Sequence, residues 1–312
     1  MTGDLTNPIF SDETKARAHF EAIRWPNGPI CAHCGTVDQA TLIQGDKTRP
    51  GLYQCNACRK PFSVTVGTVM ERSHIPLNKW AAAFHLMASS KKGVSAHQLH
   101  RMLGVTYKSA WFMAHRVREA MTRGTGTPPA GANGKTVEMD EAYYGKDKGA
   151  VKPRGGFRAK LKVISLVERG GDVRSFHVEN ANRVEVIKVL FGNVDRNATL
   201  MTDESHLYHG VGRYVGRHDT VNHGKGEYVS RSDREIHTNT IEGYFSVFKR
   251  GMRGVYQHCG KRHLHRYLTE FDFRYNNRKS VGINDEMRTV RAIKGAAGKR
   301  LTYNQSRSAQ AR

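Results

Sequence analysis

Hydrophobic and polar residues alternate in short runs near the start of the chain. Residues 39–43, 51–54 and 62–66 switch between apolar and polar side chains, which is the pattern of short half-buried strands. A turn through Gly45 and Asp46 separates the first two runs. This part of the chain is therefore predicted to form a small antiparallel sheet.

From residue 77 onwards the apolar residues recur every three or four positions, which predicts three helices. The first runs from Leu77 to near residue 93. Ser95, with Gln98 three residues later, forms a capping box that opens the second helix, and Gly104 marks its end. The third helix is expected to be capped by Thr106, and the inward faces of the second and third helices are expected to consist of Leu99, Met102 and Leu103, and of Ala110, Met113, Ala114 and Val117.

The second half of the chain returns to alternation after a linker rich in Gly, Pro and Thr. The expected elements are strands at 135–144, 161–167 and 173–178, a helix at 182–191, a strand at 198–202, and helices at 237–250 and 261–278. Strands mixed with helices in this order predict an α/β domain of about 150 residues.

The chain is expected to be multi-domain, because 312 residues are about twice the length of an ordinary domain. The predicted parts are an N-terminal segment 1–25, a small β part 26–70, a helical segment 71–122, a linker 123–134, an α/β domain 135–280 and a basic tail 281–312. On the motifs described below, 26–70 is expected to be a zinc ribbon, 71–122 a helix-turn-helix-like DNA-binding segment and 135–280 the catalytic domain. From Arg278 onwards the chain has nine basic and two acidic residues, an excess of 9 − 2 = +7. We expect much of this tail to be disordered without a partner.

The whole chain is strongly basic, with 50 Lys and Arg against 28 Asp and Glu and a formal net charge of +22. Such an excess repels itself in a compact protein, and a polyanionic partner relieves the repulsion. Nucleic acid is the first candidate and an anionic membrane surface the second, while a basic protein without such a partner is the plain alternative.

The longest apolar run, residues 80–88, is far below the roughly 20 residues that a bilayer requires. The N-terminus also lacks the pattern of a signal peptide, so a cytoplasmic protein is expected.

Four of the five cysteines form two CxxC pairs, Cys31 with Cys34 and Cys55 with Cys58. In a cytoplasmic protein such pairs favour metal binding over disulfides. Zinc takes four thiolates in a tetrahedron, and two CxxC turns joined by a hairpin make a zinc ribbon. One structural Zn²⁺ is therefore predicted, with a redox-active cysteine pair as the alternative.

The second and third helices of the first half follow the helix-turn-helix pattern, since only Gly104 and Val105 separate their apolar stripes. The third helix would then offer Tyr107, Lys108, and His115 or Arg116 to a DNA groove. A helical bundle that binds no DNA gives the same pattern.

Two aspartates are candidate metal ligands in the α/β domain. Asp140 is expected in the first strand, on the face opposite Val137 and Met139, and Asp203 at the end of a later strand. Carboxylates from two strands can share divalent ions, although an Asp at a strand end is also an ordinary turn residue.

The helix at 237–250 carries two stripes. Ile241, Tyr244, Phe245 and Phe248 form the predicted buried face, and Asn239, Glu242, Ser246 and Lys249 form a second stripe beside it. Glu242 could complete a metal shell, Asn239 could supply or orient an oxygen ligand, and Lys249 could hold a phosphate. An exposed Glu–Lys stripe is the alternative, although seven residues are too far apart for an ion pair along the helix.

Five short sequence motifs together resemble those of one known protein family. They are residues 137–145 (VEMDEAYYG), 201–205 (MTDES), 221–228 (VNHGKGEY), 237–246 (HTNTIEGYFS) and 264–268 (LHRYL). Together with the order zinc ribbon, helical segment, Asp, Asp, Glu, they resemble the DDE transposases of bacterial insertion sequences, in particular the insertion-sequence family numbered 1595. The resemblance spans about residues 15 to 280.

The resemblance implies an RNase H-like catalytic domain in which Asp140, Asp203 and Glu242 hold two Mg²⁺ or Mn²⁺ ions, with Asn239 or His237 as alternatives for the third position. Water would cut the DNA at the element's ends, and the freed 3′-hydroxyl would then attack target DNA by the same in-line displacement. It also implies double-stranded DNA as partner, a homodimer or larger synaptic complex, and a place near the bacterial nucleoid, not a membrane. The residues expected to bind phosphate are Lys108, Arg116, Arg118, Arg250, Arg253, Lys261, Arg262 and His263, and His223 is expected either to orient a water or phosphate or to be a solvated loop residue.

Two other functions stay open from the sequence. The first is a DNA-binding regulator that uses the zinc ribbon and the helix-turn-helix and carries a degenerate catalytic domain. The second is an RNase H-like nuclease that cuts DNA without joining it. The presence of Asp140, Asp203 and Glu242 in matching contexts favours the transposase.

Overall fold

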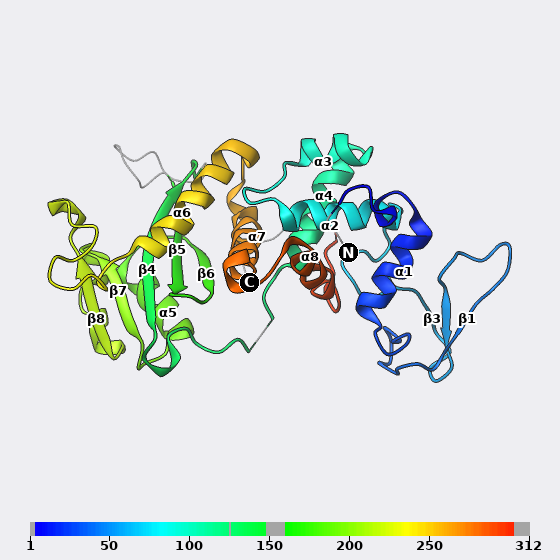
Figure 1. Ribbon diagram of the computed structural model, residues 1–312, viewed down its shortest axis with the longest axis horizontal. Helices are drawn as coiled ribbons and strands as arrows, with labels where there is room; N and C mark the ends of the chain where they lie inside the picture. Colours follow the sequence, from blue (N-terminus) through cyan, green and yellow to red (C-terminus); the bar gives the residue numbers. More distant parts are fainter. Residues whose placement is uncertain (1–3, 125, 148–159, 303–312) are drawn as a thin grey trace. The chain divides into compact units, whose positions relative to one another are not determined.

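The computed structural model describes residues 4–124, 126–147 and 160–302, and the chain divides into two compact units (Figure 1). Unit 1 consists of Met1–Thr122 and Gly282–Arg312, and unit 2 of Arg123–Val281. Among the described residues, no helix is both long enough and apolar enough to cross a bilayer.

The N-terminal part of unit 1 is a small three-stranded sheet beside a helix. After η1 (Pro8–Phe10), helix α1 (Glu13–Arg24) begins at Asp12, whose carboxylate accepts the Thr14 and Lys15 amides. The strands β1 (Ala40–Leu42), β2 (Tyr53–Cys55) and β3 (Pro61–Phe62) pair antiparallel in that order. The rings of Trp25, Tyr53 and Phe62 pack together with centroids 5.6–5.8 Å apart and form the core of this part.

The predicted third strand at 62–66 is wrong beyond its first residue. Strand β3 ends at Phe62, and a turn closes at Ser63, whose carbonyl accepts the Val66 amide at 3.0 Å. The alternation of Val64 and Val66 with polar residues is real, but the chain folds back before a partner strand can pair with it.

The three predicted helices of unit 1 are confirmed as α2 (Leu77–Ser89), α3 (Ala96–Leu103) and α4 (Tyr107–Ala120). The Ser95 side chain accepts the Gln98 amide, and Gly104 ends α3 in the left-handed conformation at φ 58°. Thr106 caps α4 by accepting the Ser109 amide. One inward residue was predicted wrongly: Met102 is 48% exposed, because it lies at the edge of the face that buries Leu99 and Leu103.

Up to Thr302, the segment after residue 281 differs from the expected disordered tail, and the rest of the predicted tail, 303–312, lies outside the described residues. Helix α8 (Asp285–Lys294) belongs to unit 1 and packs against α2 (Figure 1). Arg288 donates to the Ala88 carbonyl at 3.2 Å, and Thr289 and Ile293 are buried. The high charge of this segment hid an amphipathic helix, because its basic residues occupy the outer face or cap neighbouring carbonyls.

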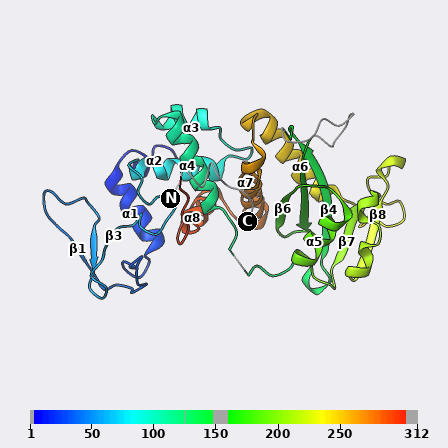
Figure 2. The ribbon, with the colours of Figure 1, turned by 180° about the vertical axis from the view of Figure 1, so that it is seen from behind.

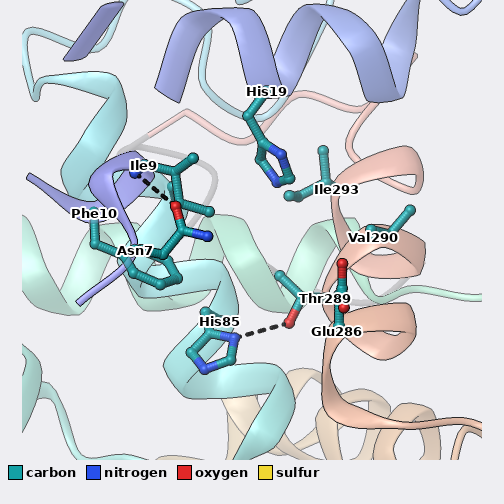
Figure 3. Close-up of a pocket in the computed structure, with 10 residues that line it drawn as sticks. Asn7, Ile9, Phe10, His19, His85, Glu286, Thr289, Val290 and Ile293 are labelled. Atoms are coloured by element: carbon teal, nitrogen blue, oxygen red, sulfur yellow. Dashed lines mark hydrogen bonds between the residues drawn. The ribbon is translucent and has the colours of Figure 1, made fainter. Parts of the chain in front are cut away.

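A cavity of about 30 Å³ lies between the N-terminal segment, α1, α2 and α8. Figure 3 shows His19, His85 and Glu286 around it, with the His85 ring 3.3 Å from the Thr289 hydroxyl. Burial lowers the pKa of His19, so its ring stays neutral at physiological pH. The space suits about one or two waters and no larger ligand.

Unit 2 is a five-stranded mixed sheet with the order β6-β5-β4-β7-β8. Its strands are β4 (Thr136–Tyr144), β5 (Leu161–Glu168), β6 (Val173–Val178), β7 (Thr199–Asp203) and β8 (Arg217–Val221). Strand β5 runs antiparallel to β4 and β6, and β4, β7 and β8 are parallel. The first four strands are confirmed, whereas β8 was not predicted, because the sequence RHDTV of this edge strand lacks an apolar alternation.

Helices cover both faces of the sheet (Figure 2). Helix α5 (Arg183–Asn193) packs on one face over Val137, Met139 and Leu200. Helices α6 (Asn239–Gly251) and α7 (Leu264–Asn276) pack on the other face over Ala142 and Tyr144. The remaining short elements of unit 2 are η2 (Ala132–Gly134), η4 (His206–Tyr208), η5 (Val211–Tyr214), η6 (His223–Lys225), the π-helical turn η7 (Met252–Tyr256), η8 (Lys261–His263) and η9 (Lys279–Val281).

Candidate functional site

Asp140 and Asp203 lie at the same level of neighbouring parallel strands. The paired residues of β4 and β7 run from Thr136 with Thr199 to Glu138 with Met201, an offset of 199 − 136 = 63. Continued two residues beyond the last pair, this offset brings Asp140 level with Asp203 (203 − 140 = 63), and the charge of Asp203 acts on Asp140. Neighbouring strands are about 4.8 Å apart, and residues at one level point to one face. Both carboxylates therefore point to the face that α6 covers.

The surroundings of these acids oppose the loss of their protons. Burial raises the pKa of Asp140 to about 8, and the charges of Glu141 and Asp203 act in the same direction, while Lys249 acts against them. Burial also raises the pKa of Asp203, and Glu204 and Glu242 add to the effect. Carboxylates held together against their own repulsion are the arrangement that a cation relieves.

Glu242 lies near Asp203, on the first turn of α6. Its Oε1 accepts the Thr238 hydroxyl at 3.1 Å and lies 3.3 Å from Nε2 of His223. The Glu204 carboxylate accepts the amides of His223 and Gly224 at 2.9 and 2.8 Å and so holds the loop that carries this histidine. His223 is therefore beside the acids and is not the solvated loop residue of the alternative reading.

The other predicted residues of this helix have different surroundings. Asn239 is exposed at the first position of α6, and Lys249 lies 5.7 Å from the Phe245 ring and influences Asp140 through its charge. His237 bonds to Arg169 at 3.0 Å through Nδ1, which also lies 3.4 Å from Glu138. These contacts occupy Nδ1 of His237, whereas the Glu242 carboxylate remains 39% exposed and available to a ligand.

The three carboxylates are more widely spaced than the ligands of a single ion. Among the described residues, the four cysteines are the one set of three or more metal-ligating side chains whose ligand atoms all lie within 4.8 Å. Two ions about 3.5–4 Å apart need carboxylates on both sides of the pair, which is a wider set. Asp140, Asp203 and Glu242 do not form such a compact set in the described part of the chain.

Two acids of β4 were missed by the sequence analysis. Glu141 accepts the hydroxyl of Tyr208 in a short hydrogen bond, and burial raises the pKa of this carboxyl group. Glu138 is fully buried and contacts Arg169, Thr240 and the Ile241 amide. Acids at positions 138, 140 and 141 of one strand were a visible signal, because a buried strand seldom carries so many charges.

The four cysteines form a second candidate site, in unit 1. The Sγ atoms of Cys31 and Cys58 are 3.7 Å apart, and those of Cys34 and Cys55 are 3.6 Å apart. Zinc–sulfur bonds of about 2.3 Å in a tetrahedron separate the sulfurs by about 3.8 Å, so the cluster has the dimensions to bind one zinc ion. The amides of His33 and Cys58 point to Sγ of Cys31 and Cys55, as the CxxC turns require.

The predicted DNA-binding residues of α4 divide into exposed and buried ones. Tyr107 and Lys108 are exposed at its start. Arg116 is half-buried, donates to the Leu301 carbonyl at 3.2 Å and stacks on the Phe112 ring. The predictions for His115 and Arg118 are wrong, because both are buried, at 0% and 2% exposure. Both point from α4 into the bundle on the turns that also bury Ala114 and Val117.

The predicted basic band after α6 is also divided. Arg250, Arg253 and Arg262 are exposed. Lys261 contacts the carboxylates of Glu179 and Asp147, and its hydrogen bond to Glu179, followed by that to Asp147, raises the pKa of Lys261. The prediction for His263 is wrong, because the residue is 7% exposed at the buried start of α7.

Two segments of the chain match known transposase domains. Residues 131–276 match the ISXO2-like transposase domain, and residues 11–61 match the transposase zinc-ribbon domain, both of the insertion-sequence family numbered 1595. An uncharacterized protein in transposable element ISH50 of Halobacterium salinarum is 27% identical over 298 residues, which cover 85% of this chain and 91% of that protein.

A solved structure gives a weaker similarity. A chain in the structure of the simian T-cell lymphotropic virus intasome with PP2A regulatory subunit B56 gamma is 14% identical, and the match covers 56% of this chain and 63% of that chain. The present chain thus spans less than two thirds of it, and the TM-score of 0.28 is too low to establish a shared fold.

Proposed function

Because the chain belongs to the insertion-sequence transposases of the family numbered 1595, we propose that it cuts DNA at the ends of its element and joins the freed 3′-hydroxyl to target DNA. The observation that carries the proposal is the parallel register that sets Asp140 opposite Asp203, with Glu242 near Asp203 on the helix above. Two carboxylates on one face of a sheet and a third on the helix that covers this face are suited to hold the two divalent ions of a phosphoryl-transfer site.

The topology of unit 2 supports an RNase H-like catalytic domain. The sheet order is β6-β5-β4-β7-β8, and β5 alone runs against the other four strands. The first acid lies in the central strand, the second at the end of the neighbouring strand, and the third on a helix that follows the sheet.

In this proposal Asp140, Asp203 and Glu242 would hold two Mg²⁺ or Mn²⁺ ions. Bound ions of this kind lower the pKa of an attacking hydroxyl and stabilise the departing oxygen. His223 keeps Glu242 oriented, and Lys249 supplies positive charge near Asp140. Water hydrolyses the phosphodiester at the element's end, and the resulting 3′-hydroxyl displaces the 3′-oxygen of a target phosphodiester.

DNA is proposed to bind to unit 1 through the zinc ribbon and through α3 and α4 as a helix-turn-helix. Exposed side chains there include Arg101, Tyr107 and Lys108, and His97 stacks on Tyr107 at 4.3 Å between centroids. In unit 2, Arg250, Arg253 and Arg262 are proposed to bind phosphates. Since the two element ends must be handled together, a homodimer or larger synaptic complex on chromosomal DNA in the cytoplasm is part of the proposal.

The decisive experiment incubates the protein with Mg²⁺ or Mn²⁺ and a DNA fragment that carries the element's ends, together with a target plasmid. The expected products are nicked ends and joined molecules. Nicks without joined molecules would instead favour an RNase H-like nuclease. DNA binding without either product would favour a regulator with a degenerate catalytic domain.

DNA binding is expected to weaken steeply with salt, since each neutralised phosphate contributes about −0.9 to the slope of log K against log salt. Lys108→Ala is expected to weaken binding similarly for all sequences and to reduce the slope by about 1. Fluorescence anisotropy at several salt concentrations measures both. Lys188→Ala on α5, where the lysine pairs with Glu185, is the matched control and should change neither. An affinity that stayed flat with salt would contradict the assignment.

Metal binding is expected to depend on pH, because an ion must displace the proton that burial retains on Asp140. The raised pKa of about 8 predicts that Mn²⁺ affinity rises up to about tenfold per pH unit below pH 8 and levels off above it. Titration of the electron paramagnetic resonance signal of free Mn²⁺ tests this. Affinity independent of pH between about 6 and 8 would show that Asp140 does not carry the proton.

A further inference from the structure

Glu138 is a wholly buried acid two residues before Asp140 on the same face of β4. The proposed function gives it no role. We propose that Glu138 and Arg169 form a positioning pair, which fixes the start of α6 on the sheet and thereby sets Glu242 against Asp140 and Asp203. The inference rests on the proposed function and names the residues that give the metal site its geometry.

The Glu138 carboxylate takes the place of a helix cap. Its Oε2 accepts the Ile241 amide at 2.9 Å, and its Oε1 accepts the Thr240 hydroxyl at 2.8 Å. Thr238, the residue before α6, makes no capping bond with its own side chain. The first amides of a helix need acceptors, and a carboxylate at this end also interacts favourably with the helix dipole. Here the cap comes from the central strand of the sheet.

Arg169 holds the other side of the pair. It follows β5 directly, and its Nε donates to Glu138 Oε1 at 2.7 Å. Its two terminal nitrogens donate to the carbonyls of Glu235 and His237 at 2.7 and 2.8 Å. One guanidinium thus joins the buried acid to the segment that leads into α6. A buried carboxylate without such a partner strongly destabilises the folded state, so the Arg169 contact is required because Glu138 is buried.

The position of Glu242 depends directly on these contacts. Glu242 follows Ile241, and its Oε1 also accepts the Thr238 hydroxyl at 3.1 Å. Glu138 and Asp140 lie in one strand, only two residues apart. The strand that carries the first acid therefore also binds the start of α6. A displacement of about 1 Å in a metal ligand is enough to reduce binding or catalysis strongly. Loss of the pair should therefore weaken the metal site without removing any ligand.

The test measures Mn²⁺ binding to the full chain by electron paramagnetic resonance, which does not depend on activity. Glu138→Gln and Arg169→Gln are each expected to weaken Mn²⁺ binding about 10- to 100-fold, the usual cost of losing a residue that orients metal ligands. DNA affinity measured without divalent ions should be unchanged. The double variant should be no weaker than the singles, because the two residues act as a unit.

Asp272→Asn is the matched control for general destabilisation. Asp272 is a half-buried acid that also contacts α6, since its carboxylate accepts the Tyr244 hydroxyl at 2.6 Å, but this contact lies further along the helix. It should lower the thermal midpoint and leave Mn²⁺ binding as in the wild type. An equal loss of Mn²⁺ binding in Asp272→Asn and Glu138→Gln would overturn the inference.

Failure of the positioning role can be distinguished from failure of the proposed function. If Glu138→Gln folds and binds Mn²⁺ with the affinity of the wild type, the positioning role is refuted. If Glu138→Gln does not fold, Arg169→Lys keeps the charge and loses the fork of donors, so a partial weakening is expected and wild-type affinity would refute the role equally. If the wild type shows no Mn²⁺ binding that is lost in Asp140→Asn, the proposed function is overturned, and the inference with it.

Discussion

Asp140→Asn is expected to lower DNA cutting and joining on the order of 10³-fold or more, while DNA affinity stays within about twofold of the wild type. The amide keeps the size of the carboxylate but loses the charge that would hold two cations beside Asp203. The proposed function assigns DNA affinity to exposed basic residues of both units, which the substitution does not change. Cutting of end-labelled DNA and anisotropy on the same DNA measure the two effects separately.

The same substitution is expected to stabilise the metal-free protein. Burial raises the pKa of Asp140 to about 8, far above the value of about 3.9 in an unfolded chain. Between these values the folded state binds more protons than the unfolded state, so the stability of the wild type falls as pH rises from about 4 to 8. Asparagine does not ionise, and the stability gain should therefore grow across this window. A gain of about 1 kcal/mol raises the melting temperature by about 2–4 °C.

Glu185→Gln is the control for both measurements, because this acid lies on α5 and pairs with Lys188 on the opposite face of the sheet. It should cut DNA as the wild type does, and at each pH its melting temperature should equal that of the wild type at that pH. Undiminished cutting by Asp140→Asn would refute the assignment of the first acid. A melting difference independent of pH would show that the carboxyl group titrates normally.

Local signals along the chain predicted most elements correctly, because their causes are local. Ser95, Gly104 and Thr106 define helix ends through bonds to amides three residues away or through the left-handed conformation of glycine. The positions of Val137 and Met139 on one face and Asp140 on the other follow from the two-residue period of a strand. The register that sets Asp140 opposite Asp203 joins segments 63 residues apart and leaves no local trace.

The errors share a physical origin in long-range packing. His115 and Arg118 are basic residues on a predicted DNA-binding helix, yet both are buried in unit 1. Glu138 was not singled out, because its partners Arg169 and Ile241 are distant in sequence. Charge alone assigned α8 to a tail, although its apolar face packs on α2. A charged residue in the sequence therefore does not establish a surface position, because the folded chain can bury it beside a partner.

Cys55→Ser is expected to abolish zinc binding and to unfold the ribbon. The three strands of the ribbon have three, three and two residues, too few to bury a core that is stable alone. Cys55 is fully buried, and its Sγ faces that of Cys34 at 3.6 Å. A thiolate–zinc bond is then replaced by a hydroxyl that binds zinc poorly. Zinc content should fall from about one ion per chain to none, and protease should cut between α1 and β3.

Cys259→Ser provides the comparison, because this fifth cysteine lies in unit 2 beside the α6–α7 core and outside the four-cysteine cluster. It should retain one zinc ion and resist protease as the wild type does. DNA affinity should fall at least about tenfold in Cys55→Ser alone, since an unfolded ribbon no longer presents its basic residues as one surface. If Cys55→Ser keeps a folded ribbon and binds DNA without zinc, the aromatic contacts of Trp25, Tyr53 and Phe62 are sufficient to hold the sheet. The thiols would then be open to the redox chemistry that CxxC pairs also support.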